Sequence, residues 1–309
     1  MKSLATNKEL YFYIKEKVLN RDNKIMDHIL INELQNKQKI VSIVMTSSNR
    51  IAQTYYTLET IKSSSYPNVQ VILVEDSDKE ILDIEKLKSY GLHIDLIKIK
   101  RENKIWINPV VNYNIGFNFI IGDYIIIQNA EVCHLGDVIN FIVSNIQNNQ
   151  YYVFDVRPIK NFESNEIIYN LKPSDNSIYL REELFMGWWY QHKSLNRNLH
   201  FLTALTKNTF DVIKEFSYDY TLTIDYDDND FVLKIISNKI NILNVDNDEY
   251  KIGGIHLFHE SAQTAWSKNF ESNGDLYKRK VKYFLNNGEY IDVTKNYNDY
   301  ESNYKKLLV

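Results

Sequence analysis

The sequence predicts an α/β fold in which helices flank a mostly parallel central sheet. Two observations support this prediction. Short apolar segments rich in β-branched residues alternate with segments of helical spacing, which is the pattern of repeated β-α-β units. Each apolar segment also ends in polar residues, as parallel strands do beside a ligand cleft. With 309 residues, the chain is long enough for one large domain or two modest ones.

The composition excludes several classes of protein. Apolar residues make up 44% of the chain and charged residues 25%, as in globular rather than disordered proteins. The 36 basic and 40 acidic residues leave a net charge of −4, so there is no basic excess for nucleic acid. The single cysteine, Cys133, excludes an intrachain disulfide and fits a reducing compartment. No apolar run reaches 18 residues and no signal h-region is present, so we expect a cytoplasmic protein without a transmembrane segment.

The predicted elements follow in the order expected for such a sheet. Residues 3–36 carry apolar positions at helical spacing and predict two short helices. VSIVM (41–45) and VQVILV (69–74) predict buried strands, and the stretch between them, IAQTYYTLETIKSS, predicts a helix. The elements expected after these are a helix over 79–90, a strand over 94–100, a helix over 110–121 and a strand over 124–127.

Three polar clusters stand at the ends of predicted strands: TSSNR (46–50), EDSD (75–78) and QNAE (128–131). Taken singly, each could be a helix cap or a turn. The carboxyl ends of parallel strands meet at one edge of the sheet, where ligands bind. Three clusters in register, each after a buried strand, therefore favour one shared cleft.

These segments resemble the GT-A glycosyltransferases, specifically family 2-like enzymes with a galactosyltransferase-type C-terminal half. VSIVMTSSNR, VQVILVEDSD and the stretch from Asn108 to Glu131 are similar to the opening strand, the acidic nucleobase strand and the segment that ends at the DXD motif. IDYDDNDF (224–231) resembles the acidic acceptor-side motif, and GGIHLFHE (253–260) resembles the late histidine motif. The order of the five segments is that of the family. The resemblance implies a Rossmann-like sheet.

The resemblance covers roughly residues 39–265 and implies a division of the chain. Residues 1–38 are expected to form a helical N-terminal extension. Residues 39–265 would form the glycosyltransferase domain, with a nucleotide-sugar half (39–135) and an acceptor half (136–265). Residues 266–309 are expected to form a helical C-terminal tail. Neither end matches the family well, and either could mediate homo-oligomerisation.

The activity that the resemblance implies is transfer of a hexose from a UDP-sugar to a saccharide acceptor, with inversion. Asp76 is expected to accept a hydrogen bond from a pyrimidine N3–H, with Glu75 as its neighbour. Ser48 stands where an aromatic residue often stacks on the base in the family. The other residues expected to contact the base, the phosphates or the donor sugar are Thr46, Arg50, Asn114 and Asn129.

The metal site that the resemblance implies departs from the family's pattern, because Asn129-Ala130-Glu131 replaces its aspartates. Asn129 is a neutral, weaker ligand, so Glu131 would hold the Mn²⁺ or Mg²⁺. His256 or His259 would be a second ligand, and an imidazole favours Mn²⁺. Both histidines could reach the metal from a helix or tight turn, but only one from an extended strand, and we favour His256. The alternative is that both are surface or core histidines.

Four aspartates crowd residues 225–230, and mutual repulsion with partial burial would make one carboxylate a stronger base. By its place in the motif, Asp228 is the expected general base, and Asp227 would hold the acceptor. The alternatives are a solvated acidic loop or a Ca²⁺ site, although the glycine and distal glutamate of a calcium loop are missing.

The segment MGWWYQHKSLNR (186–197) is expected to contribute Trp188, Trp189 and His192 to acceptor binding. Tryptophans in such a position are also often core and surface cover. Cys133 and His134 lack partners at ligand spacing, so a structural role is expected.

Two other functions remain open. A catalytically degraded sugar-nucleotide-binding protein would explain Asn129, and a non-enzymatic glycan-binding protein would use Trp188 and Trp189. A nucleotidyltransferase would need a Gly- and Lys-rich loop, which does not follow VSIVM.

Overall fold

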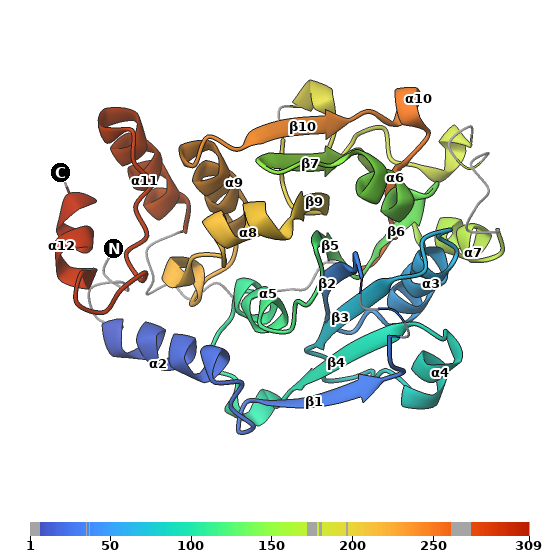
Figure 1. Cartoon of the computed structure of the whole chain (residues 1–309), viewed down its shortest axis with the longest axis horizontal. Helices are drawn as coiled ribbons and strands as arrows, with labels where there is room; N and C mark the ends of the chain where they lie inside the picture. Colours follow the sequence, from blue (N-terminus) through green and yellow to red (C-terminus); the bar gives the residue numbers. More distant parts are fainter. Residues whose placement is uncertain are drawn as a thin grey trace.

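The computed structural model describes residues 7–34, 36, 38–171, 178, 181–195, 197–260 and 273–308. An eight-stranded sheet with the order β1-β4-β3-β2-β5-β9-β7-β10 runs through the molecule, with helices on both faces (Figure 1). A smaller sheet has the order β6-β11-β8. The strands are β1 (Met26–Ile31), β2 (Val41–Ser47), β3 (Val69–Glu75), β4 (His93–Ile99), β5 (Tyr124–Asn129), β6 (Val132–Leu135), β7 (Gln150–Phe154), β8 (Val156–Pro158), β9 (Leu202–Thr206), β10 (Asn241–Val245) and β11 (Gly253–His256).

The four strands predicted from apolar segments form the parallel centre of the large sheet. β4, β3, β2 and β5 pair in parallel, and most of their residues are buried because helices cover both faces. The prediction of two helices over 3–36 is wrong in its second half. Residues 26–31 form β1, which pairs antiparallel with β4 at the sheet edge. Its first and last residues are buried and the four between them are exposed or half-buried, which fits a strand at the edge of the sheet.

Helices pack on both faces of the sheet. Leu58 of α3, Leu87 of α4 and Ile142 of α6 belong to the core of one face. Val111 of α5 and Phe231 of α9 belong to the core of the other. The α-helices are α2 (Lys8–Leu19), α3 (Ile51–Lys62), α4 (Ile84–Ser89), α5 (Val110–Phe117), α6 (Val138–Asn145), α7 (Phe162–Tyr169), α8 (Lys207–Ile213), α9 (Asp227–Ser237), α10 (Asn247–Tyr250), α11 (Asn273–Asn287) and α12 (Tyr300–Lys306), and short 3₁₀ turns cover Arg101–Asn103, Glu182–Leu184, Lys193–Leu195 and Tyr218–Tyr220.

The two expected helices on the nucleotide-sugar half are shorter than predicted. The helix expected over 79–90 is α4 alone, because Asp83 caps it by accepting a hydrogen bond from the backbone N–H of Lys86. The helix expected over 110–121 ends at Phe117, and Gly122 then approaches the backbone of β2 too closely for any Cβ.

The described parts of the two chain ends lie together at one end of the molecule (Figure 1). Tyr11 of α2, Leu276 of α11 and Tyr300 of α12 share one apolar cluster with Tyr220. The helical tail expected over 266–309 is thus found from residue 273 onward, whereas 266–272 lie outside the described residues. Among the described helices, none has both the length and the apolar character needed to cross a membrane.

Candidate active site

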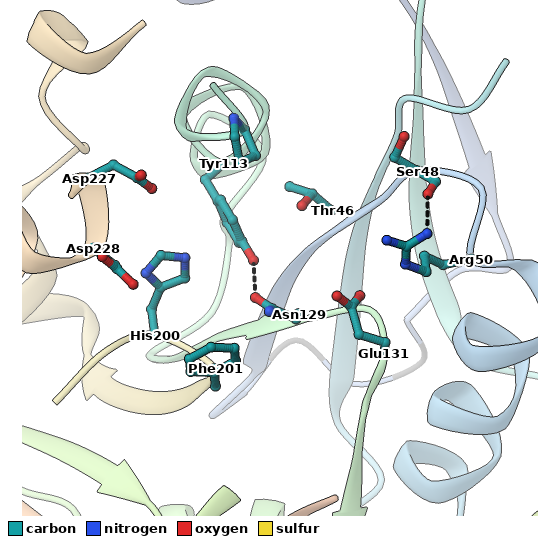
Figure 2. Close-up of a pocket in the computed structure, with 11 residues that line it drawn as sticks. Thr46, Ser48, Arg50, Tyr113, Asn129, Glu131, His200, Phe201, Asp227 and Asp228 are labelled. Atoms are coloured by element: carbon teal, nitrogen blue, oxygen red, sulfur yellow. Dashed lines mark hydrogen bonds between the residues drawn. The ribbon is translucent and has the colours of Figure 1, made fainter. Parts of the chain in front are cut away.

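A cavity of about 260 Å³ opens where β2 and β5 end, as the polar clusters predicted. A second cavity of about 830 Å³ shares lining residues with the first and extends to Asp76. Acidic groups stand on two sides of the smaller cavity, with Asp227 and Asp228 across from Glu131 and the ring of Tyr113 between them (Figure 2). The residues that line it are Thr46, Ser48, Arg50, Pro109, Tyr113, Asn129, Glu131, His200, Phe201, Asp227 and Asp228.

The small sheet brings Glu131, His256 and His259 together. Glu131 stands in the turn between β5 and β6, and β11 pairs antiparallel with β6, which places His256 beside Val132. The backbone N–H of Leu257 then donates to the carbonyl of Glu131 at 2.9 Å. The strand ends at His256, so the next segment is free to turn His259 back toward the carboxylate. One ligand atom from each of the three residues lies within 4.8 Å of the other two.

The charges of this cluster suit a divalent cation. Burial would raise the pKa of Glu131, but the hydrogen bond with His259 and the nearby His256 and Arg50 outweigh it and hold the pKa at about 2. Burial lowers the pKa of His256 to about 4, so its imidazole is neutral at pH 7 and keeps a lone pair. The Nε2 atoms of His259 and His256 lie 3.3 and 3.7 Å from Glu131 Oε1. A carboxylate with two imidazoles is a donor set that fits Mn²⁺.

Asp227 and Asp228 are the first residues of α9, which points its N-terminus at the cavity. Burial, followed by the neighbouring charge of Asp228, raises the pKa of Asp227 to about 6. Burial also raises the pKa of Asp228. Asn108 Nδ2 donates to Asp227 Oδ1 at 3.1 Å and fixes that carboxyl group. The remaining aspartates of the cluster do not line the smaller cavity, and Asp230 pairs instead with Lys280 on the far side of the helix.

Asp76 and Glu75 point in different directions although they are adjacent. Asp76 lines the larger cavity, where Lys104, Arg101 and Asn112 donate to its carboxylate. Glu75 instead accepts a hydrogen bond from the backbone N–H of Leu82 at 2.7 Å. The structure therefore places Asp76 at the candidate nucleotide site and Glu75 outside it.

The predicted asparagines also separate. Asn129 lines the smaller cavity, and its Oδ1 accepts a hydrogen bond from the Tyr113 hydroxyl at 3.0 Å. Asn114 lines neither cavity, because its amide is used twice by the backbone of Phe216, at 3.0 and 2.9 Å. The geometry gives Asn114 a structural role instead of the expected contact with the donor.

The tryptophans lie outside both cavities. Trp189 packs against His192, and Trp188 is 45% exposed and packs edge-on against Tyr190. The ring of Tyr190 in turn lies 4.6 Å from that of His256. Tyr190 and Phe201 are thus ring neighbours of His256, and Trp188 is one ring further out.

Four residues that line the smaller cavity were not predicted as site residues: Pro109, Tyr113, His200 and Phe201. Tyr113 precedes Asn114 in a helical stretch, where an aromatic ring is expected to belong to the hydrophobic core. His200 is an isolated histidine before β9, and an isolated histidine does not by itself predict a functional site. Burial lowers the pKa of His200 to about 4, so it faces the two aspartates as a neutral imidazole (Figure 2). Cys133 and His134 are buried, and His134 Nε2 lies 2.8 Å from Gln128 Oε1, as expected for structural residues.

Comparisons with known proteins agree with this architecture. The model of the family described as glycosyl transferase family 2 matches residues 42–204. No curated protein matches the chain significantly. The crystal structure of S. aureus TarS is similar with a TM-score of 0.57 and 9% identity, over 87% of this chain and 43% of that one. The structure of GalNAc-T7 with UDP, GalNAc and Mn²⁺ has a TM-score of 0.56 and 14% identity, over 92% of this chain and 55% of that one.

A further structure, a shorter form of TarS in complex with UDP-GlcNAc, has a TM-score of 0.51 and 12% identity, over 87% of this chain and 70% of that one. The chain spans about half the length of the first two of these proteins. At such low identity the likenesses establish the fold, which is GT-A. Because the family model matches more than half of the sequence, this chain belongs to glycosyl transferase family 2.

Proposed function

We propose that the protein transfers a hexose from a UDP-sugar to a saccharide acceptor, with inversion, using a divalent cation and Asp228 as general base. The observation that carries the proposal is that Glu131, which forms a cluster with His256 and His259, lies across one cavity from Asp227 and Asp228. The leaving diphosphate and the attacking hydroxyl of a single displacement need opposite faces of the sugar. A donor held between the two groups would meet both needs.

The residues of the nucleotide side would bind and orient the donor. Glu131, His256 and His259 would hold Mn²⁺, which acts as a Lewis acid on the leaving diphosphate. Arg50 lines the same cavity and adds positive charge beside the phosphates. UDP is the first nucleotide to test, because structural neighbours were solved with UDP, GalNAc and Mn²⁺ or with UDP-GlcNAc.

The larger cavity would offer a pyrimidine edge both hydrogen-bond donors and an acceptor. The donors are Lys104 and Arg101, and the acceptor is Asp76. The match with UDP would come from uracil, whose carbonyls accept hydrogen bonds and whose N3–H donates one. Selective binding of UDP over GDP and CDP would follow from this end of the site.

The residues of the acceptor side would remove a proton. Asp228 would take the hydrogen of the acceptor hydroxyl, and Asp227, held by Asn108, would accept a second hydrogen bond from the acceptor. The raised pKa of Asp228 makes it a stronger base than an exposed aspartate. The neutral ring of His200 adds no positive charge to this side.

Calorimetry tests the donor site. UDP, GDP and CDP are titrated with and without Mn²⁺ into wild type, Glu131→Ala and the exposed control Glu85→Ala. We expect selective binding of UDP that strengthens with Mn²⁺, that is lost in Glu131→Ala and that persists in the control. A screen of UDP-sugars for release of UDP then identifies the donor. No binding of any nucleotide would refute the transferase assignment and favour a glycan-binding protein, and binding without turnover would favour a degraded enzyme.

A further inference from the structure

The turn that leads into α9 has an unfavourable backbone conformation. Asp225 and Tyr226 both have positive φ, at 72° and 65°, and they come directly before Asp227 and Asp228. Residues with a Cβ adopt this left-handed region rarely, and two in succession need contacts from the surrounding structure to hold them. The direction in which α9 presents its two aspartates depends on this turn.

The first residue of α11 supplies such contacts. Asn273 is 6% exposed, and its Nδ2 donates to the carbonyl oxygens of Ile224 and Asp225, each at 2.9 Å. Its Oδ1 accepts a hydrogen bond from the Thr223 hydroxyl. Both polar atoms of the Asn273 side chain therefore make hydrogen bonds, and these bonds hold the three consecutive residues 223–225 that lead to Asp227 and Asp228.

The neighbours of Asn273 on α11 hold the side chain of Tyr226. A Cβ on Gly274 would lie 3.0 Å from Tyr226 Cε2, so a larger residue there would require the ring to shift by a few tenths of an ångström. The ring of Tyr277 packs on that of Tyr226, with centroids 5.6 Å apart. The turn is thus fixed through both its backbone and its side chain.

A second asparagine holds the turn from the other side. Asn108 Nδ2 donates to the carbonyl of Thr223 at 2.9 Å as well as to Asp227. The turn therefore lies between Asn108, just before α5, and Asn273, at the start of α11. These two residues are far apart in the sequence. Helix α11 therefore contacts the turn that leads into Asp227 and Asp228, although its described residues line neither cavity.

We propose that Asn273 is a positioning residue, which fixes the turn at 225–226 so that Asp227 and Asp228 enter the cavity in a reactive orientation. The inference rests on the proposed function for the identity of the reaction. Asn273 lines neither cavity, although Ile224, Asp225 and Tyr226 of the turn line the larger one. Because the residues proposed to hold the metal and the nucleobase lie on other elements, we expect the loss of its hydrogen bonds to slow the chemical step and to leave donor binding intact.

The test compares Asn273→Asp with Asn287→Asp. Both changes place a carboxylate on α11, but Asn287 is exposed and its amide contacts only the Tyr283 carbonyl in the last turn. In Asn273→Asp, carboxylate oxygens would face two carbonyls that have lost their donor. We expect kcat for UDP release to fall by about 100-fold, as for other small misplacements of reacting groups. The KM for the donor and the affinity for UDP with Mn²⁺ remain at the wild-type values, and Asn287→Asp matches wild type in all of these.

Each outcome decides one point. Equal kcat in the two variants would overturn the inference. A fall in UDP affinity equal to the fall in kcat would also overturn it, since that result indicates general damage. If wild type turns over no UDP-sugar, the proposed function fails, and amide exchange of residues 223–228 then tests the inference: faster exchange in Asn273→Asp alone supports it, and equal exchange refutes it. If Asn273→Asp does not fold, Gly274→Ala displaces Tyr226 and is expected to give the same separation of kcat from donor KM.

Discussion

Replacement of Lys280 by methionine is expected to destabilise the protein strongly. Lys280 lies on α11 with a fully buried side chain, and its Nζ is 2.7 Å from Asp219 Oδ2 and 3.2 Å from Asp230 Oδ1. Methionine fills a similar volume without the charge, so packing changes little. The loss would come from the two carboxylates, which stay buried without their cation.

The structure sets the magnitude. Breaking a buried ion pair by removing one partner costs about 3–5 kcal/mol. Asp219 keeps hydrogen bonds from the backbone N–H groups of Val293 and Thr294, and Asp230 keeps those from Tyr220 and Tyr290. These remaining partners limit the cost, so we expect about 3 kcal/mol. For a chain of 309 residues, whose entropy of unfolding is about 0.65 kcal/mol/K, that corresponds to a fall in Tm of roughly 5 °C.

The assay is urea or thermal unfolding of wild type, Lys280→Met and the control Lys278→Met. Lys278 is on the same helix, and its exposed pair with Asp275 at 3.6 Å is worth at most about 1 kcal/mol. Adding Asp230→Asn to Lys280→Met should restore part of the stability, because the amide needs no cation. Equal free energies of unfolding for the two lysine variants would refute the account of this cluster.

The pH dependence of the same variant has a definite sign. Burial raises the pKa of Asp230, and Lys280 opposes that rise. Without Lys280 the folded-state pKa of Asp230 rises further above its unfolded value, so the folded state binds a proton more tightly than the unfolded state. The cost of the substitution is then largest at neutral pH and shrinks as the pH falls through the raised pKa of Asp230.

Four further predictions concern activity and metal binding. Asp228→Asn should lower kcat by about 10²- to 10⁴-fold with UDP affinity unchanged, measured by UDP release and calorimetry. Wild-type kcat should fall as the pH drops, because burial raises the pKa of the base Asp228, which must be ionised, and raises the pKa of its neighbour Asp227 to about 6; a flat profile from pH 8 to 5 would contradict this. Glu131→Gln should weaken Mn²⁺ binding by at least about tenfold in a titration, since the only anionic ligand of the cluster is lost. His256→Ala should do the same, whereas the control His192→Ala should bind Mn²⁺ as wild type does.

Local patterns predicted the parallel centre of the fold. The stretches at 41–45, 69–74, 94–100 and 124–127 are short and rich in apolar β-branched residues, as strands buried on both faces are. The strand at Met26–Ile31 was missed because only its first and last residues are buried, so the six residues show no period-two pattern. Periodicity distinguishes a strand from a helix only over longer segments.

The site was predictable where a motif names both residue and place, as for Glu131, Asp76 and Asp228. The sequence predicts less well which side chains face a cavity. Glu75 and Asp76 are adjacent at a strand end, where successive side chains point to opposite faces, and composition does not say which one faces the cleft. The approach of His259 to Glu131 depends on pairing between β6 and β11, which spacing along the chain does not reveal.

The central claim is that one cavity holds a metal-bound donor on the side of Glu131 and a base on the side of Asp228. Crystals grown with UDP and Mn²⁺ test it directly, through the anomalous signal of manganese. The account predicts a single strong peak among the ligand atoms of Glu131, His256 and His259, with the diphosphate beside it and Asp228 across the cavity. A peak at Asp227 and Asp228, or UDP bound with no manganese near Glu131, would contradict it.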